Sequence, residues 1–160
     1  MWDGIELAKS KSNDGIEVLI KTVQGSHNLL DVGCGVHSIL PLVHAITTTD
    51  NPSTFLLQQP EVHVHPVSQA ELAQYMVEES PHDYIVETHS DHIVDRLRLC
   101  VARRVLQPEK LVILYFENNE DGSGTNIHNI SVDSQGVPVN PPDTYREFFL
   151  TETHRLLGLE

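Results

Sequence analysis

The sequence predicts an α/β fold with a largely parallel sheet and crossover helices. Apolar runs typical of strands alternate with helical patterns along most of the 160 residues. Residues 110–116 are almost continuously apolar, as in a strand covered on both faces. Polar clusters follow two other apolar runs, at residues 58–66 and 87–92. Such clusters lie at the carboxyl edge of a parallel sheet, where ligands usually bind.

The predicted elements follow from apolar periodicity and turn residues. Residues 1–15 are polar and punctuated by glycine, and we expect a flexible start. Residues 16–23 alternate as a strand, and residues 29–32 form a short strand before a Gly-Cys-Gly turn. Helices are predicted where apolar residues recur at helical spacing, over residues 36–47, 67–79, 90–104 and 145–157. Further strands are predicted over residues 54–58, 84–87, 110–116 and 125–132.

The domain organisation expected from this order is simple. The chain is long enough for one domain or a part of one, and we expect a single partial domain over residues 1–160. Its core spans residues 16–117, and residues 118–160 add a C-terminal β-hairpin and helix. Ser90 is expected to cap the helix that follows it.

Composition excludes several classes of function. The chain has 10 Lys and Arg against 23 Asp and Glu, and its net charge of -13 excludes polyanion binding by the chain as a whole. Its two cysteines, Cys34 and Cys100, give neither a disulfide framework nor a zinc-finger spacing. No secretory signal and no apolar run of membrane-spanning length is visible, so we expect a cytoplasmic protein.

The stretch Asp31-Val32-Gly33-Cys34-Gly35 has two interpretations on its residues alone. It resembles the glycine-rich first motif of class I methyltransferases, in which a strand ends in an acid and the turn admits S-adenosylmethionine. It also fits a phosphate site, because glycines before a helix expose backbone N–H groups to an anion. His37 or Ser38 would then add a side-chain donor.

The stretch Gln58-Gln59-Pro60-Glu61-Val62-His63-Val64-His65-Pro66 suggests metal chemistry. On a strand, Glu61, His63 and His65 would point to one side, and His-x-His beside a carboxylate is typical of metal-dependent hydrolases. His89 and a neighbouring acid would complete such a metallohydrolase site. The Gln pair argues against it, because amides are poor ligands for transition metals.

Taken together, three stretches carry a more specific resemblance. In order, they are Val32-Gly33-Cys34-Gly35-Val36, residues 56–66, and Glu87-Thr88-His89-Ser90. The chain resembles the C-terminal half of ABC-type ATPases of the RecF, SMC and OLD kind, which are AAA-family ATPases of bacteria. Several of these are linked to DNA repair or phage defence. The resemblance covers roughly residues 16–157 and implies the C-terminal lobe of an ABC-type, P-loop NTPase head.

The resemblance assigns roles to individual residues. In such ATPases a nucleotide is held between two heads, and the signature turn of one head faces the γ-phosphate of ATP on the other. Gly33 and Gly35 match that turn, with His37 at the position of the signature serine and Ser38 next to it. His89 matches the switch histidine, which senses the γ-phosphate.

The Walker B strand departs from the family pattern. The family ends this strand in an acid that holds the Mg²⁺ shell and a carboxylate that orients the attacking water. This chain has Gln58 and Gln59 there, and an amide cannot take the proton of that water. Glu61 is the candidate substitute, and Gln58 keeps at most a weak role in the Mg²⁺ shell. We therefore expect slow hydrolysis or a nucleotide-gated switch.

The sequence also lacks the Gly-x-x-x-x-Gly-Lys-Ser/Thr motif of a P-loop. The resemblance therefore implies that ATP and Mg²⁺ bind only in a site completed by a Walker A-bearing half, from the same gene or a separate chain. The chain alone is expected to be inactive. A head-to-head dimer and a DNA or nuclease partner are the further partners that the resemblance implies.

Overall fold

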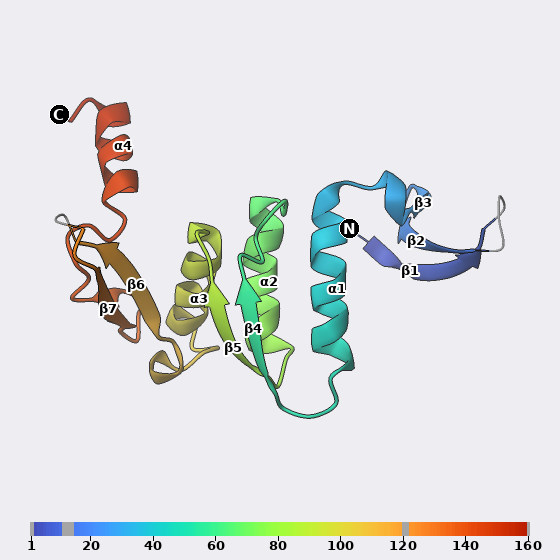
Figure 1. The fold of residues 1–160 in the computed structure, drawn as a ribbon, viewed down its shortest axis with the longest axis horizontal. Coiled ribbons are helices and arrows are strands. Elements are labelled where there is room, and N and C mark those ends of the chain that lie inside the picture. Colours follow the sequence, from blue (N-terminus) through green and yellow to red (C-terminus); the bar gives the residue numbers. More distant parts are fainter. Residues whose placement is uncertain (1, 11–14, 120–121, 160) are drawn as a thin grey trace. The chain divides into compact units, whose positions relative to one another are not determined.

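The computed structural model describes residues 2–10, 15–119 and 122–159. The chain divides into two compact units, Met1–Ile93 and Val94–Glu160. The α/β class is confirmed, because helices follow strands through most of the chain (Figure 1). In the part of the chain that the structure describes, no helix has the length and apolar character needed to cross a bilayer.

The first unit begins with an antiparallel sheet. Strands β1 (Trp2–Lys9), β2 (Ile16–Thr22) and β3 (Gly25–Asn28) pair in that order, and Ile20 of β2 is buried. The expected flexible start is therefore wrong for β1, while residues 11–14 lie outside the described residues. The physical reason is pairing: β1 satisfies its backbone groups along β2, with Ile5 opposite Ile20.

A short 3₁₀ helix, η1 (Leu29–Asp31), replaces the strand expected at residues 29–32. Asn28 starts it, because its side-chain oxygen accepts a hydrogen bond from the Leu30 N–H at 2.9 Å. Such capping by Asn offers the backbone a local alternative to a strand ladder. Asp31 therefore does not stand at the end of a strand.

The remainder of the first unit contains a strand–helix–strand unit. Helix α1 (Cys34–Thr48) precedes strand β4 (Thr54–Gln58), helix α2 (Pro66–Glu78) and strand β5 (Asp83–Glu87). Strands β4 and β5 pair in parallel, as a helical crossover between them requires.

The expectation of a largely parallel sheet is wrong. Within the described residues, β4 and β5 are the one parallel pair, and the other strand pairs are antiparallel. The reason lies in the connections: short turns join most neighbouring strands, and a short turn can join only antiparallel strands.

His82 holds the base of this strand–helix–strand unit together. Its side chain is 7% exposed and lies between the end of α1 and the starts of β4 and β5. Its Nδ1 accepts a hydrogen bond from the Ser53 N–H at 3.2 Å, so its Nε2–H donates to the Ile46 carbonyl at 3.1 Å. The ring also packs against Phe55, with ring centroids 5.0 Å apart. The imidazole thus satisfies two backbone groups at once.

Helix α3 (Asp91–Ala102) continues into the second unit. There it is followed by η2 (Pro108–Lys110), strands β6 (Ile113–Asn118), β7 (Thr125–Val132) and β8 (Pro138–Val139), and helix α4 (Glu147–Leu157). The three strands pair antiparallel in sequence order. Val101, Leu111 and Val132 form the core of this unit.

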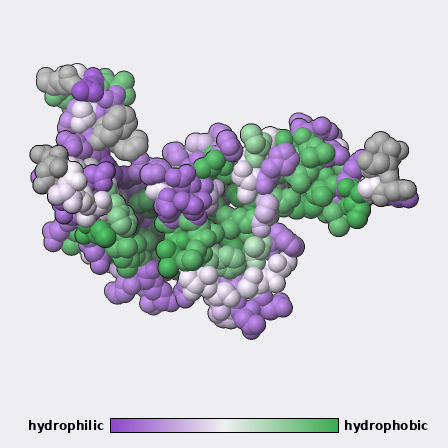
Figure 2. Space-filling view, in the orientation of Figure 1, coloured by the Kyte–Doolittle hydropathy of each residue, from purple (hydrophilic) through white to green (hydrophobic). Residues whose placement is uncertain are grey.

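The apolar run at residues 110–116 was expected to be covered on both faces, and this expectation is wrong. It starts as η2 because Pro108 favours a helical turn, and in β6 exposed residues alternate with half-buried ones. Phe116 and its register partner Ile127 are each 61% exposed. Hydrophobic surface is visible over β6 and β7 and also over β4 and β5 (Figure 2).

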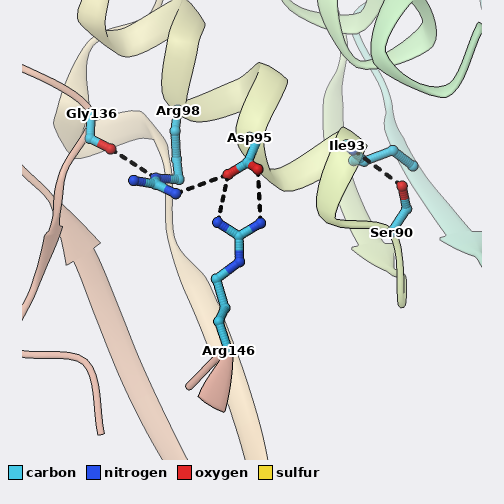
Figure 3. Close-up of polar contacts among 6 residues, drawn as sticks. All are labelled: Ser90, Ile93, Asp95, Arg98, Gly136 and Arg146. Atoms are coloured by element: carbon cyan, nitrogen blue, oxygen red, sulfur yellow. Dashed lines mark hydrogen bonds and ion pairs between the residues drawn. The ribbon is translucent and has the colours of Figure 1, made fainter. Parts of the chain in front are cut away.

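Ion pairs connect α3 to the start of α4 inside the second unit (Figure 3). Arg146 donates to both carboxylate oxygens of Asp95 at 2.8 Å. Arg98 also donates to Asp95 at 2.8 Å, and its Nε–H donates to the Gly136 carbonyl at 2.8 Å. Partial burial raises the pKa of Asp95, but the hydrogen bonds and charges of Arg146 and Arg98 outweigh that effect and hold its pKa below the usual value.

Candidate functional site

The carboxyl ends of β4 and β5 lie side by side, and each is followed by polar residues. Gln58 is the register partner of Glu87, and both are exposed. The Gln59 N–H donates to the Glu87 carbonyl at 2.8 Å, so pairing continues one residue beyond β4. Since register partners point to the same face of a sheet, the Gln58 amide and the Glu87 carboxylate are neighbours. The Glu87 carboxylate therefore lies beside the Walker B-like position, Gln58. The strand register shows this neighbourhood, and the sequence alone does not.

Residues 59–65, here called the tip loop, connect β4 to α2. Gln59 and His63 have left-handed backbone conformations, with φ of 45° and 64°. Turn hydrogen bonds run from the Val62 N–H to the Gln59 carbonyl at 3.2 Å and from the Val64 N–H to the Glu61 carbonyl at 2.9 Å. Glu61, His63 and His65 therefore do not share one side of a strand, as the metal hypothesis required.

The histidines of this stretch have separate environments. His65 caps α2, because its Nδ1 accepts a hydrogen bond from the Val67 N–H at 3.3 Å. Pro66 follows in the first turn of α2, where a missing N–H costs nothing. Within the described residues, no group of three or more His, Cys, Asp or Glu is arranged to hold a metal ion. The metallohydrolase interpretation is therefore without support.

The methyltransferase interpretation loses its structural basis as well. It required Asp31 to end a strand of the main sheet, with the glycine turn leading into the next helix. Asp31 instead lies in η1, which follows the antiparallel sheet of β1, β2 and β3.

Glu61 joins the tip loop to the residue that matches the switch histidine. Its Oε1 accepts a hydrogen bond from the backbone N–H of His89 at 2.7 Å. Its Oε2 is buried and has no hydrogen-bond partner among the described residues. The carboxylate proposed from sequence as a substitute base is thus already bound to the backbone of another proposed site residue.

Gln69 makes a second connection between the same two segments. Its Nε2 donates to the Val64 carbonyl at 2.7 Å, and its Oε1 accepts from the Ser90 hydroxyl at 2.5 Å. The Ser90 Oγ in turn accepts from the Ile93 N–H at 3.2 Å, which confirms the predicted cap of α3 (Figure 3). No sequence signal identified Gln69, since a glutamine inside an amphipathic helix is usually a surface residue.

The glycine turn leads directly into α1. The helix begins at Cys34, two residues before the predicted start, and Gly33 is its N-cap residue with φ of -60°. No side chain caps this helix among the described residues, so its first N–H groups are available to an anion.

Gly35 has a packing role in the first turn of α1. A Cβ at Gly35 would lie 2.6 Å from the His63 carbonyl oxygen, whereas a Cβ at Gly33 would meet no described atom within 4 Å. Real Cβ atoms do not approach an oxygen so closely, so only glycine allows this packing. The start of α1 therefore rests on the backbone of the tip loop.

His37 and Ser38 differ in what they present. The Nε2 of His37 is buried and has no hydrogen-bond partner among the described residues. Ser38 is exposed, and its hydroxyl donates to the Cys34 carbonyl at 3.1 Å. Ser38 also lines a hollow of about 280 Å³ between α1 and β4, with Leu42, Leu56, Leu57, Gln58, Gln59, Pro60 and Val62.

The structure thus brings most of the sequence-predicted site residues to the tip loop. Gly35 and His89 contact it directly, Glu61 belongs to it, and Ser38, Gln58 and Gln59 line the same hollow. Gly33 lies at the open start of α1. The Nε2 of His37 is turned away from solvent.

Comparisons with known proteins agree with this arrangement at the level of the fold. A scan against protein-family models gave no match, and a search of curated proteins gave none either. Among solved structures, the chain is similar to one from work on the structural biochemistry of ATP-driven dimerization and DNA-stimulated activation of SMC ATPases. That similarity has a TM-score of 0.57 and 14% sequence identity, and it covers 96% of this chain and 83% of that chain. The chain therefore has an α/β fold similar to that of an SMC ATPase.

Proposed function

We propose that this chain is a nucleotide-binding half of an ABC-type ATPase head. It would supply the signature turn, the Walker B-like strand and the switch histidine. A Walker A-bearing half, from the same gene or a separate chain, would supply the P-loop. ATP hydrolysis would then belong to the completed head, and the 160 residues would act as one partial domain.

The observation that supports this proposal most is the meeting of the three motif stretches at one edge. Strands β4 and β5 end together, and the tip loop contacts both the start of α1 and the backbone of His89. The fold similarity to an SMC ATPase supports the same assignment.

The start of α1 suits the γ-phosphate of a nucleotide held by a second head. Among the described residues no side chain caps its first N–H groups, and the helix dipole favours an anion there. Ser38 is exposed, with its hydroxyl bonded to the Cys34 carbonyl, whereas the Nε2 of His37 is buried. We therefore favour Ser38 as the side-chain donor. A γ-phosphate near His89 would meet an imidazole whose backbone Glu61 holds in place.

The residues present fit Mg²⁺ only in part. Mg²⁺ prefers oxygen ligands, and the Gln58 amide and the Glu87 carboxylate are neighbours at the strand ends. Most of the Mg²⁺ ligands would then come from the nucleotide, from water and from the P-loop half. The bound ion would neutralise phosphate charge. Since Gln59 cannot accept a proton, we propose a slow ATPase or a nucleotide-gated switch.

Exposed apolar residues support an incomplete head. Leu56 and its register partner Ile85 are 75% and 64% exposed on one face of the β4–β5 pair. A hydrophobic face on a parallel strand pair is normally covered, because parallel sheets are buried on both faces. We propose that the Walker A-bearing half covers this face.

A role in a DNA repair or phage-defence assembly rests on the sequence resemblance. The net charge of -13 makes direct DNA binding by this chain unfavourable, so DNA or a nuclease would engage a partner. A head-to-head dimer is the assembly in which the start of α1 would reach a second nucleotide.

The experiment that tests the proposal is reconstitution. The chain is co-expressed with the polypeptide that carries a P-loop upstream of, or adjacent to, its coding region in the source genome, and binding and turnover of Mg-ATP are measured. We expect ATP binding by the complex and weak or no binding by the chain alone. Tight Mg-ATP binding by the isolated chain, or no binding by the complex, contradicts the proposal.

Two variants sharpen the reconstitution. His89→Ala should lower turnover by about 100-fold if His89 stabilises transferring phosphate. His92→Ala, an exposed histidine three residues on, is the matched control and should leave turnover unchanged. Gln59→Glu should raise turnover about 100-fold by restoring a base. An unchanged rate in Gln59→Glu would show that the missing carboxylate does not limit hydrolysis.

A further inference from the structure

We infer that the tip loop couples the start of α1 to the backbone of His89, with Glu61 as the positioning residue of that coupling. This inference rests on the proposed function for its purpose, since His89 and α1 are the proposed phosphate-facing elements. The coupling itself is a property of the chain without nucleotide. It would make the position of His89 depend on whether α1 is held by a second head.

Two close contacts at opposite ends of the tip loop carry the inference. At one end, the His63 carbonyl lies so close to Gly35 that a Cβ there would be 2.6 Å from the oxygen. At the other end, Glu61 accepts the His89 N–H at 2.7 Å, across 28 residues of sequence. A displacement of α1 therefore moves the backbone two residues from Glu61, and Glu61 moves with the backbone of His89.

The backbone of the tip loop is strained, as expected of a segment that changes between two conformations. Gln59 and His63 are non-glycine residues at positive φ, and such residues persist only where the surroundings hold them. The contacts that hold the loop include those of Gly35, of Glu61 and of Gln69, whose amide donates to the Val64 carbonyl. Loss of one contact removes part of what keeps the strained conformation in place.

Glu61 is in this view a positioning residue and not the base. Its Oε1 is committed to the His89 N–H, and its Oε2 is buried with no partner among the described residues. A carboxylate held in this way fixes a neighbouring backbone better than it can take a proton from water. The role explains why a Glu follows the Gln pair although it stands two residues beyond the usual base position.

The test measures the His89 amide in the full chain without nucleotide. Its NMR shift and its hydrogen-exchange rate report whether the Glu61 hydrogen bond is present. In Glu61→Ala we expect exchange at His89 to be faster by about tenfold or more, because a hydrogen bond to a charged acceptor is lost. Glu61→Gln, which keeps an oxygen acceptor, should restore most of the protection. Glu71→Ala, an exposed glutamate on α2, is the control.

The coupling is tested from the other end of the loop. Gly35→Ala should displace the His63 backbone and change the shift and the exchange rate of the His89 amide. Gly33→Ala, two residues away and facing open space among the described residues, is the matched control and should change neither. In the double variant Gly35→Ala/Glu61→Ala, the change in the His89 amide exchange rate should differ from the sum of the two single changes, as expected of residues in one network.

If Gly35→Ala does not fold, the reverse direction decides, because coupling is reciprocal. Glu61→Ala should then shift the amides of residues 34–36, and Glu71→Ala should not. The inference is overturned if Gly35→Ala and Gly33→Ala give the same shift and exchange rate for the His89 amide. It is also overturned if Glu61→Ala changes neither the His89 amide nor the amides of residues 34–36. Either result leaves ATP binding by the reconstituted head untouched, so the two proposals fail separately.

Discussion

The tip loop and the Asp95 ion-pair network both join distant segments, but they do so with different physical means. The tip loop uses backbone groups, a glycine contact and residues at positive φ. The network in the second unit uses charged side chains, with Asp95 about half exposed between Arg98 and Arg146. The contacts of the tip loop leave no room for one added methyl group and so fix the backbone positions closely. The ion pairs instead add stability that depends on pH and salt. The difference separates a candidate site from a structural clamp.

The largest expected effect on stability comes from His82, at the base of the strand–helix–strand unit that contains the tip loop. His82→Ala should destabilise the first unit by about 3 kcal/mol, because it empties a buried site and leaves the Ser53 N–H and the Ile46 carbonyl unpaired. Thermal unfolding followed by circular dichroism measures it. His44→Ala, on the exposed face of α1, is the control and should change the stability little. Equal effects of the two variants would mean that His82 does not hold the strand starts.

A smaller effect is expected from the glycine contact itself. Gly35→Ala should cost about 1–3 kcal/mol, because the added methyl group forces α1 away from the His63 carbonyl. Gly33→Ala at φ of -60° should be close to neutral. Chemical denaturation of the two variants compares them directly. A neutral Gly35→Ala would remove the contrast between a close-packed site and a loose surface turn.

The ion-pair network should contribute less than either contact. Arg146→Ala should cost about 1 kcal/mol at low salt, since the paired groups are partly exposed, and the loss should shrink in high salt. Arg155→Ala, which removes an exposed pair with Glu152 on α4, should cost less than about 0.5 kcal/mol. Urea titrations at two salt concentrations separate the two. A salt-independent loss would show that Arg146 acts by packing and not by charge.

The smallest expected effect is a dependence of stability on pH. The folded-state pKa of Asp95 is below its ordinary value, so the stability it contributes is fully present above the unfolded pKa, about 4. That contribution is lost as the pH falls through the lower, folded-state pKa. Asp95→Asn should flatten this part of the stability profile, which lies below about pH 4. An unchanged profile would assign the acid sensitivity to other carboxylates.

Much of the local structure was readable from the sequence because short-range patterns control it. Strands β4, β5 and β7 and helices α2 and α3 lie close to the predicted ranges, and Ser90 caps α3 as expected. The misses also have local causes. Strand β1 was missed because it forms by pairing with β2, which its own residue pattern does not indicate. Residues 29–31 form η1 and not a strand because the Asn28 side chain caps them.

By itself, the sequence determined the alternation of helices and strands, the three motif stretches and the absence of a P-loop motif, because residue types and spacing express these directly. Only the tertiary structure decided strand direction, the Gln58–Glu87 register, the contact of Gly35 with His63 and the bond from His89 to Glu61. These depend on how segments far apart in the chain meet. A left-handed residue such as Gln59 or His63 reverses where the next side chain points, and no spacing rule for strands or helices includes it.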